Sequence, residues 1–94
     1  MTETVSCEVV AVHGEEAVAE VLSHIKRIRA RCLDPIITSE DIGSLLRSHF
    51  GLSPPATTRL RNHVVRVLRA LGWLVVWDTR ELAEKTIVEY RLCF

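Results

Sequence analysis

The feature that most constrains the fold is the run SPPATTRLRNHVVRVLRALG, residues 53–72, because it carries signals for both ends of a helix. Ser53 is a favourable N-cap residue, and Pro54 stands where a helix needs no backbone N–H. Gly72 suits the left-handed position that closes a helix. The run therefore predicts one complete helix, over about residues 54–71.

This predicted helix has an apolar side and a cationic side when residues are placed 100° apart. Residues 53–72 include four arginines and no acid, so the exposed side is expected to carry positive charge. A helix that lies in a nucleic-acid groove needs such a surface. The apolar side consists of Ala56, Leu60, Val64, Val67, Leu68 and Leu71, and the other side of Thr58, Arg59, Asn62, Arg66 and Arg69. Val65 projects toward the basic side, where it is expected to meet a thymine methyl group or a protein partner.

The length of 94 residues predicts one domain with a core too small to enclose a large catalytic cleft. No glycine-rich phosphate loop or nucleophile motif occurs, so we expect neither an enzyme nor a cofactor site. The chain has no apolar stretch long enough to span a bilayer, and its start, MTETVSCEVV, lacks the basic region of a secretory signal. We expect a cytoplasmic protein.

Cysteine and histidine spacing does not indicate a metal site. The three cysteines lie far apart, which favours free buried thiols over a disulfide framework or a CxxC site. The four histidines form no HxxxH pair and are predicted to lie at the surface or at helix ends. These residues are Cys7, Cys32, Cys93, His13, His24, His49 and His63.

Charge is segregated along a chain whose formal net charge is zero. Residues 1–20 contain five glutamates and no lysine or arginine, whereas residues 26–31 contain four basic residues and no acid. Nucleic-acid binding would therefore depend on a local patch. Arginine outnumbers lysine ten to two, glutamine is missing and Asn62 is the only asparagine, a composition compatible with a thermophilic source.

The first third of the chain predicts an extended segment followed by a helix. TVSCEVVAV, residues 4–12, is rich in β-branched residues and favours an extended segment that ends at Gly14. Three alternatives are open for it: an added strand, a dimerisation arm or a lead into the next helix. Residues 14–33 then show helical spacing, with Val18, Val21, Leu22, Ile25, Ile28 and Cys32 on one face.

A short strand and a second helix are predicted between residues 34 and 52. The Asp34-Pro35 pair stops the first helix, and Ile36 and Ile37 are expected to form a very short strand. Thr38 begins TSEDIGSLLRSHFG, with Asp41 placed to complete a capping box, so a helix is expected over residues 39–49. Residues 51–53 form the turn into the basic helix. The apolar face of the second helix comprises Ile42, Leu45, Leu46 and Phe50.

Two strands are predicted after Gly72. WLVVWD and TIVEYRLCF are dense in β-branched and aromatic residues, and a polar link over residues 79–85 joins them into a hairpin. In the second strand Val88, Tyr90, Leu92 and Phe94 share one face and are expected to be buried.

The predicted order is helix, short strand, helix, turn, basic helix and two-stranded hairpin. This α+β order resembles the three-helix winged-helix DNA-binding domain. The segments ITSEDIGSLL and TTRLRNHVVRVLRALGW are similar to the typical sequence pattern of that family. The resemblance covers residues 15–94, with residues 1–14 as an N-terminal extended arm or extra strand.

The resemblance implies that the basic helix enters the major groove of double-stranded DNA and that the hairpin, the wing, touches the backbone or minor groove. Base contacts would come from Thr57, Thr58, Arg59, Arg61 and Asn62, phosphate contacts from Arg66 and Arg69, and wing contacts from Arg80 and Lys85.

The resemblance further implies a regulator of transcription that acts as a homodimer, with recognition helices about 34 Å apart. Residues 1–14 and the outer face of the first helix are candidate dimer surfaces. The alternative is a winged-helix module that binds another protein within a larger complex.

Overall fold

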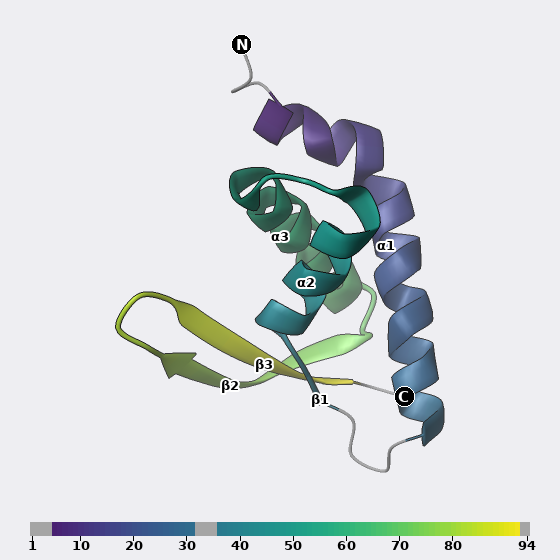
Figure 1. The fold of residues 1–94 in the computed structure, drawn as a ribbon. Coiled ribbons are helices and arrows are strands. Elements are labelled where there is room, and N and C mark those ends of the chain that lie inside the picture. Colours follow the sequence, from purple (N-terminus) through teal and green to yellow (C-terminus); the bar gives the residue numbers. More distant parts are fainter. Residues whose placement is uncertain (1–4, 32–35, 93–94) are drawn as a thin grey trace.

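The described residues of the chain fold into three helices and a three-stranded antiparallel sheet (Figure 1). The computed structural model describes residues 5–31 and 36–92. The elements follow in the predicted α+β order of helix, strand, helix, helix, strand, strand. They are α1 (Val5–Arg31), β1 (Ile36–Thr38), α2 (Ser39–Phe50), α3 (Pro54–Ala70), β2 (Leu74–Glu81) and β3 (Thr86–Leu92).

The sheet has the order β1-β3-β2, so β3 is the central strand and β2 lies at an edge. Tyr90 pairs with Ile37 on one side and with Val76 on the other. Tyr90, Leu92 and Leu74 are buried, because this face of the sheet packs against the helices. The predicted burial of Tyr90 and Leu92 is confirmed, whereas Phe94 lies outside the described residues.

Helix α3 occupies the middle of the core. Leu60, Val64 and Leu68 have no exposed surface, because α3 packs against α1 on one side and α2 on the other. Burying such aliphatic side chains stabilises the fold by roughly 1.5 to 3 kcal/mol each. The remaining fully buried residues of the helices are Ala17, Val21, Ile25, Ile42 and Leu46.

The predicted capping box of α2 is present. The Thr38 hydroxyl accepts a hydrogen bond from the Asp41 backbone N–H at 3.1 Å, and the Asp41 carboxylate accepts one from the Thr38 N–H at 3.0 Å. At the other end Gly51 has φ of 66°, and its N–H donates to the Arg47 carbonyl at 2.8 Å. Both ends of the helix are therefore fixed by local chemistry, as its sequence predicts.

The predicted bounds of α3 are also confirmed, but its buried face differs from the expected one. Ser53 is the N-cap, and Gly72 adopts φ of 86° just beyond the helix. Leu71 is 62% exposed, whereas Thr57 and Val65 are buried. The buried arc is displaced because α3 contacts α2 and β2 as well as α1.

The prediction of an extended arm over residues 1–14 is wrong for residues 5–14, which form the first turns of α1. Val9 is 3% exposed and continues the helical row of Ala17, Val21 and Ile25. Gly14 does not end a segment. A Cβ atom there would lie 3.1 Å from the His63 ring, so glycine permits the close approach of α1 to α3.

Helix α1 has 27 residues, but length alone does not make a membrane helix. Charged side chains interrupt its apolar row along most of its length. No helix in the described part of the chain is both long enough and apolar enough to span a membrane.

The hairpin is longer in strand and shorter in turn than predicted. β2 continues to Glu81, which pairs with Thr86, so the link is only residues 82–85. The Leu82 N–H donates to the Lys85 carbonyl at 2.8 Å and closes this turn. The last residues of β2 are polar, so the sequence pattern does not indicate a strand there. An ion pair between Arg80 and Glu89 supports the ladder at this end.

The capping box predicts the effect of Thr38→Ala. The variant loses a hydrogen bond to the first turn of α2 and should lower the free energy of unfolding by about 1 kcal/mol, as measured by urea denaturation. Ser48→Ala, at an exposed position of the same helix, is the matched control and should change stability by less than about 0.5 kcal/mol. Equal losses from the two substitutions would contradict the role given to Thr38.

Candidate nucleic-acid interface

The exposed side of α3 is a cationic surface without an acid. Arg59, Arg66 and Arg69 are exposed, and Arg61 is half-buried. Among the described residues none of these four arginines makes an ion pair; Arg61 makes one weak hydrogen bond, at 3.4 Å, to the Asn62 side chain. The guanidinium groups are thus available to an anionic partner.

Local chemistry fixes the direction in which this side faces. The Ser53 hydroxyl accepts a hydrogen bond from the Ala56 N–H at 3.5 Å, and two prolines fill the first helical positions. The fully buried Leu60 and Leu68 then hold one side of the helix against the core. Rotation of α3 would expose these leucines, so its arginines are held toward solvent.

A hollow of about 300 Å³ lies between the start of α3 and α2. Thr57, Thr58 and Arg61 line it from α3, and Glu40, Ser44 and Arg47 line it from α2. Gly43 also lines it, and a Cβ atom at this position would make an ordinary van der Waals contact, 3.8 Å from the Cδ atom of Arg61. We call this hollow the α2 hollow; its lining includes two arginines, three hydroxyl groups and the Glu40 carboxylate, which pairs with Lys85.

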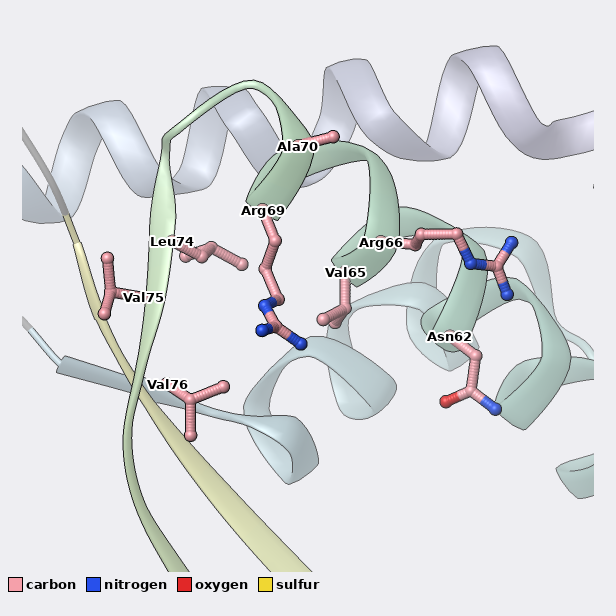
Figure 2. A pocket seen from close by; sticks show the side chains of 8 residues that line it. All are labelled: Asn62, Val65, Arg66, Arg69, Ala70, Leu74, Val75 and Val76. Carbon is pink, nitrogen blue, oxygen red and sulfur yellow. The ribbon is translucent and has the colours of Figure 1, made fainter.

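A second groove, of about 620 Å³, lies between the end of α3 and the edge strand β2. Val65, Arg66 and Arg69 line it from α3, and Leu74, Val75 and Val76 line it from β2. Figure 2 shows the Arg69 side chain extending into the space between the helix and the strand, whereas Arg66 points away from β2. We call this groove the β2 groove. Its walls combine arginine with apolar side chains, unlike those of the α2 hollow.

The two predicted wing cations are engaged within the protein. Arg80 lies 2.8 Å from the Glu89 carboxylate, and Lys85 pairs with Glu40 at the start of α2. Their charges are balanced where they stand. The wing therefore presents less free positive charge than α3 does.

One residue of the predicted base-reading set has little exposed surface. Thr57 is 7% exposed, and its hydroxyl donates to the Ser53 carbonyl at 2.9 Å, so it stabilises the first turn of α3 at the wall of the α2 hollow. Thr58, Arg59, Arg61 and Asn62 remain on the open side or at its edge.

Sequence reasoning missed Ser44 and Arg47, which the turn between the helices brings beside Thr58 and Arg61. Their signal was present in α2. Both are exposed, on the side of the helix away from the buried Ile42 and Leu46. The α2 face opposite the core therefore extends the cationic surface of α3.

Tyr90 lies beneath the arginines of α3. Burial raises the pKa of Tyr90 above its usual value of 10.0, while the positive charges of Arg61 and Arg69 act to lower it. Since burial dominates, the phenol stays neutral and protonated around neutral pH. Tyr90 thus contributes no negative charge beneath the cationic side of α3.

Comparisons of the chain with family models, curated proteins and solved structures found no match. The site is accordingly interpreted from its own geometry. Within the described residues no three histidine, cysteine or carboxylate side chains are gathered in a way that could hold a metal ion. Arginines, hydroxyl groups and one amide are the chemically distinctive groups of the surface.

The surroundings of Tyr90 predict a pH dependence that can be assigned without ambiguity, because Tyr90 is the only tyrosine. The near-ultraviolet absorbance of tyrosinate should titrate above the usual pKa of 10.0, and further above it in Arg69→Ala, which removes a charge that lowers the pKa.

When the pKa of a tyrosine is higher in the folded than in the unfolded chain, the group contributes to the stability of the fold. This contribution is complete at any pH below about 10. This contribution is lost as the pH rises through the folded pKa. Arg27→Ala, an exposed arginine of α1, is the control. An equal pKa in the wild type and Arg69→Ala would contradict the electrostatic coupling.

Proposed function

We propose that this chain is a winged-helix domain that binds double-stranded DNA through α3, in the manner of a transcription regulator. The observation that carries the proposal is the exposed side of α3, where four arginines that make no ion pair among the described residues stand on a helix fixed by its buried leucines. Phosphate neutralisation by arginine supplies most of the sequence-independent affinity for DNA.

The α2 hollow adds a second argument for the major groove. Arg47 lies on α2 beside Arg61 of α3, so the cationic surface crosses both helices of the helix-turn-helix. In such motifs the second helix contacts base edges with its first turns while the first helix crosses the backbone. Thr58, Arg59, Arg61 and Asn62 are therefore assigned to bases, and Arg47 and Arg66 to phosphates.

Two predicted contacts contribute less to this assignment. Arg80 and Lys85 would have to leave Glu89 and Glu40 to reach DNA, and Arg69 would reach a phosphate only where the DNA backbone passes the β2 groove. Paired wing cations also favour the alternative function, a winged-helix module that binds another protein. The proposed DNA-binding role implies that the protein is located with the DNA, which is the cytoplasm in a cell whose DNA is cytoplasmic.

Salt dependence separates the two functions. Binding to a random-sequence duplex, followed by fluorescence anisotropy, should weaken with a log–log slope of roughly −4. On a duplex without a preferred sequence Arg59 and Arg61 contact phosphates together with Arg47 and Arg66, and each of the four displaces about 0.9 counterion. No binding at low salt would overturn the DNA proposal and leave the protein-binding alternative.

The division of roles along α3 predicts different outcomes for two substitutions. Arg59→Ala should relax sequence preference by about 1 to 3 kcal/mol at one position, as measured by selection from a randomised duplex library. Arg66→Ala should weaken binding to all sequences and reduce the salt slope by about 1. Arg27→Ala on α1 is the matched control and should leave both unchanged. Identical effects of Arg59→Ala and Arg66→Ala would reject this division.

A further inference from the structure

The edge strand β2 carries the most exposed cluster of large apolar side chains in the described part of the sheet. Val75, Val76 and Trp77 are 49%, 39% and 55% exposed. They are consecutive, and β2 pairs with β3 on one side only. The backbone N–H and C=O groups on its other side have no sheet partner among the described residues. An exposed apolar edge of this kind is a template for another strand.

The charge of the β2 groove indicates the charge that an added strand should carry. Its walls contain Arg66 and Arg69 and no acid, and neither arginine makes an ion pair among the described residues. Its floor includes the apolar Val65 and Leu74. A strand that complements both features would place an acidic side chain beside Arg69 and would pair with the apolar edge of β2.

The second half of β2 has this composition. Asp78 and Glu81 follow the apolar residues, and Arg80 between them pairs with Glu89 of β3. The strand is therefore apolar and flanked by arginine at its start, and its free charges toward the end are acidic. An antiparallel copy of the same strand would set the acidic end of each chain against the basic start of the other. The charges of β2 and its groove are thus self-complementary.

We propose that two copies of this chain associate through their β2 edges, with the strands antiparallel, and form one continuous six-stranded sheet. A two-fold axis between Trp77 and Asp78 places Leu74 opposite Glu81 of the second copy. Directly opposed side chains in such a pair have Cβ atoms about 5 Å apart. Glu81 of each copy then lies next to Arg69 of the other, at the mouth of the β2 groove.

The register of β2 against β3 makes this arrangement possible. Leu74 pairs with the buried Leu92 and faces the helices. The irregularity between Val76 and Asp78 shifts the alternation, so Glu81, which pairs with Thr86, faces the same way as Leu74. Opposed side chains of the two copies therefore lie on the same face of the joined sheet. Without the irregularity they would lie on opposite faces.

The dimer would also cover Trp77. This side chain stacks on Arg91 of its own chain, with the guanidinium carbon 5.0 Å from the ring centroid, and otherwise projects into solvent. The two-fold axis places the two Trp77 side chains on either side of it, on the outer face of the sheet. Burial of the indole should shift its fluorescence to shorter wavelength as the dimer forms.

The β2 dimer would be the dimer of the proposed DNA-binding protein, and its formation is tested without DNA. Sedimentation equilibrium of the full chain under reducing conditions should give twice the chain mass at high concentration. Arg69→Glu and Glu81→Arg should each raise the dissociation constant at least about tenfold, because each creates two like-charge contacts. The double variant R69E/E81R should restore association to within about threefold of wild type.

Glu84→Arg is the matched control, because it makes the same charge change in the turn beyond β2 and should leave the mass unchanged. Arg69, Glu81 and Glu84 are all exposed, and far-ultraviolet circular dichroism verifies that each variant is folded. In a Trp73→Phe background, where Trp77 is the remaining tryptophan, emission should shift with concentration in the wild-type edge and not in Arg69→Glu.

A monomer at all concentrations, or a double variant that associates no better than the single ones, would overturn the β2 dimer. A monomer that binds DNA would overturn the dimer and leave the proposed function. A dimer whose dissociation constant changes with these charges, but which binds no duplex, would support the β2 dimer and overturn the proposed function.

Discussion

The burial of one side of α3 is the constraint on which the rest of the structure depends. Leu60, Val64 and Leu68 are fully buried between α1 and α2, so the helix has one orientation and one free side. All four of its arginines then lie on that free side or along its edges, because none can be placed among the leucines without a large desolvation cost. The position of the charges is thus a consequence of core packing and not of any contact between the arginines.

The close approach of α1 and α3 at Gly14 and His63 extends the same constraint. A long first helix covers the length of α3 from behind, which leaves α2 and the hairpin to flank its open side. The α2 hollow and the β2 groove are the spaces between α3 and these two neighbours. They differ in chemistry because α2 presents a carboxylate, a hydroxyl and a guanidinium group, whereas the beginning of β2 presents a leucine and two valines.

Signals that act within a few residues could be predicted from the sequence, and contacts between distant residues could not. The capping box at Thr38, the N-cap at Ser53 and the left-handed Gly72 each depend on neighbours within one turn. Gly14 was misinterpreted as a break because its partner, His63, is remote in sequence. The same limit applies to Lys85, whose partner Glu40 lies 45 positions away, and to Arg47, whose place beside Arg61 depends on how α2 and α3 pack.

The proposed dimerisation through the β2 edge and the proposed DNA binding through α3 require different side chains of the same domain. DNA binding needs arginines that stay free, and among them Arg69 is the least suited, since its side chain extends toward valines and away from the open side of the helix (Figure 2). A glutamate of a second copy beside Arg69 would neutralise this arginine while leaving Arg59, Arg61 and Arg66 available. The proposed association through β2 would therefore use the charge that DNA would use least, and the two proposed activities would not compete for the same side chains.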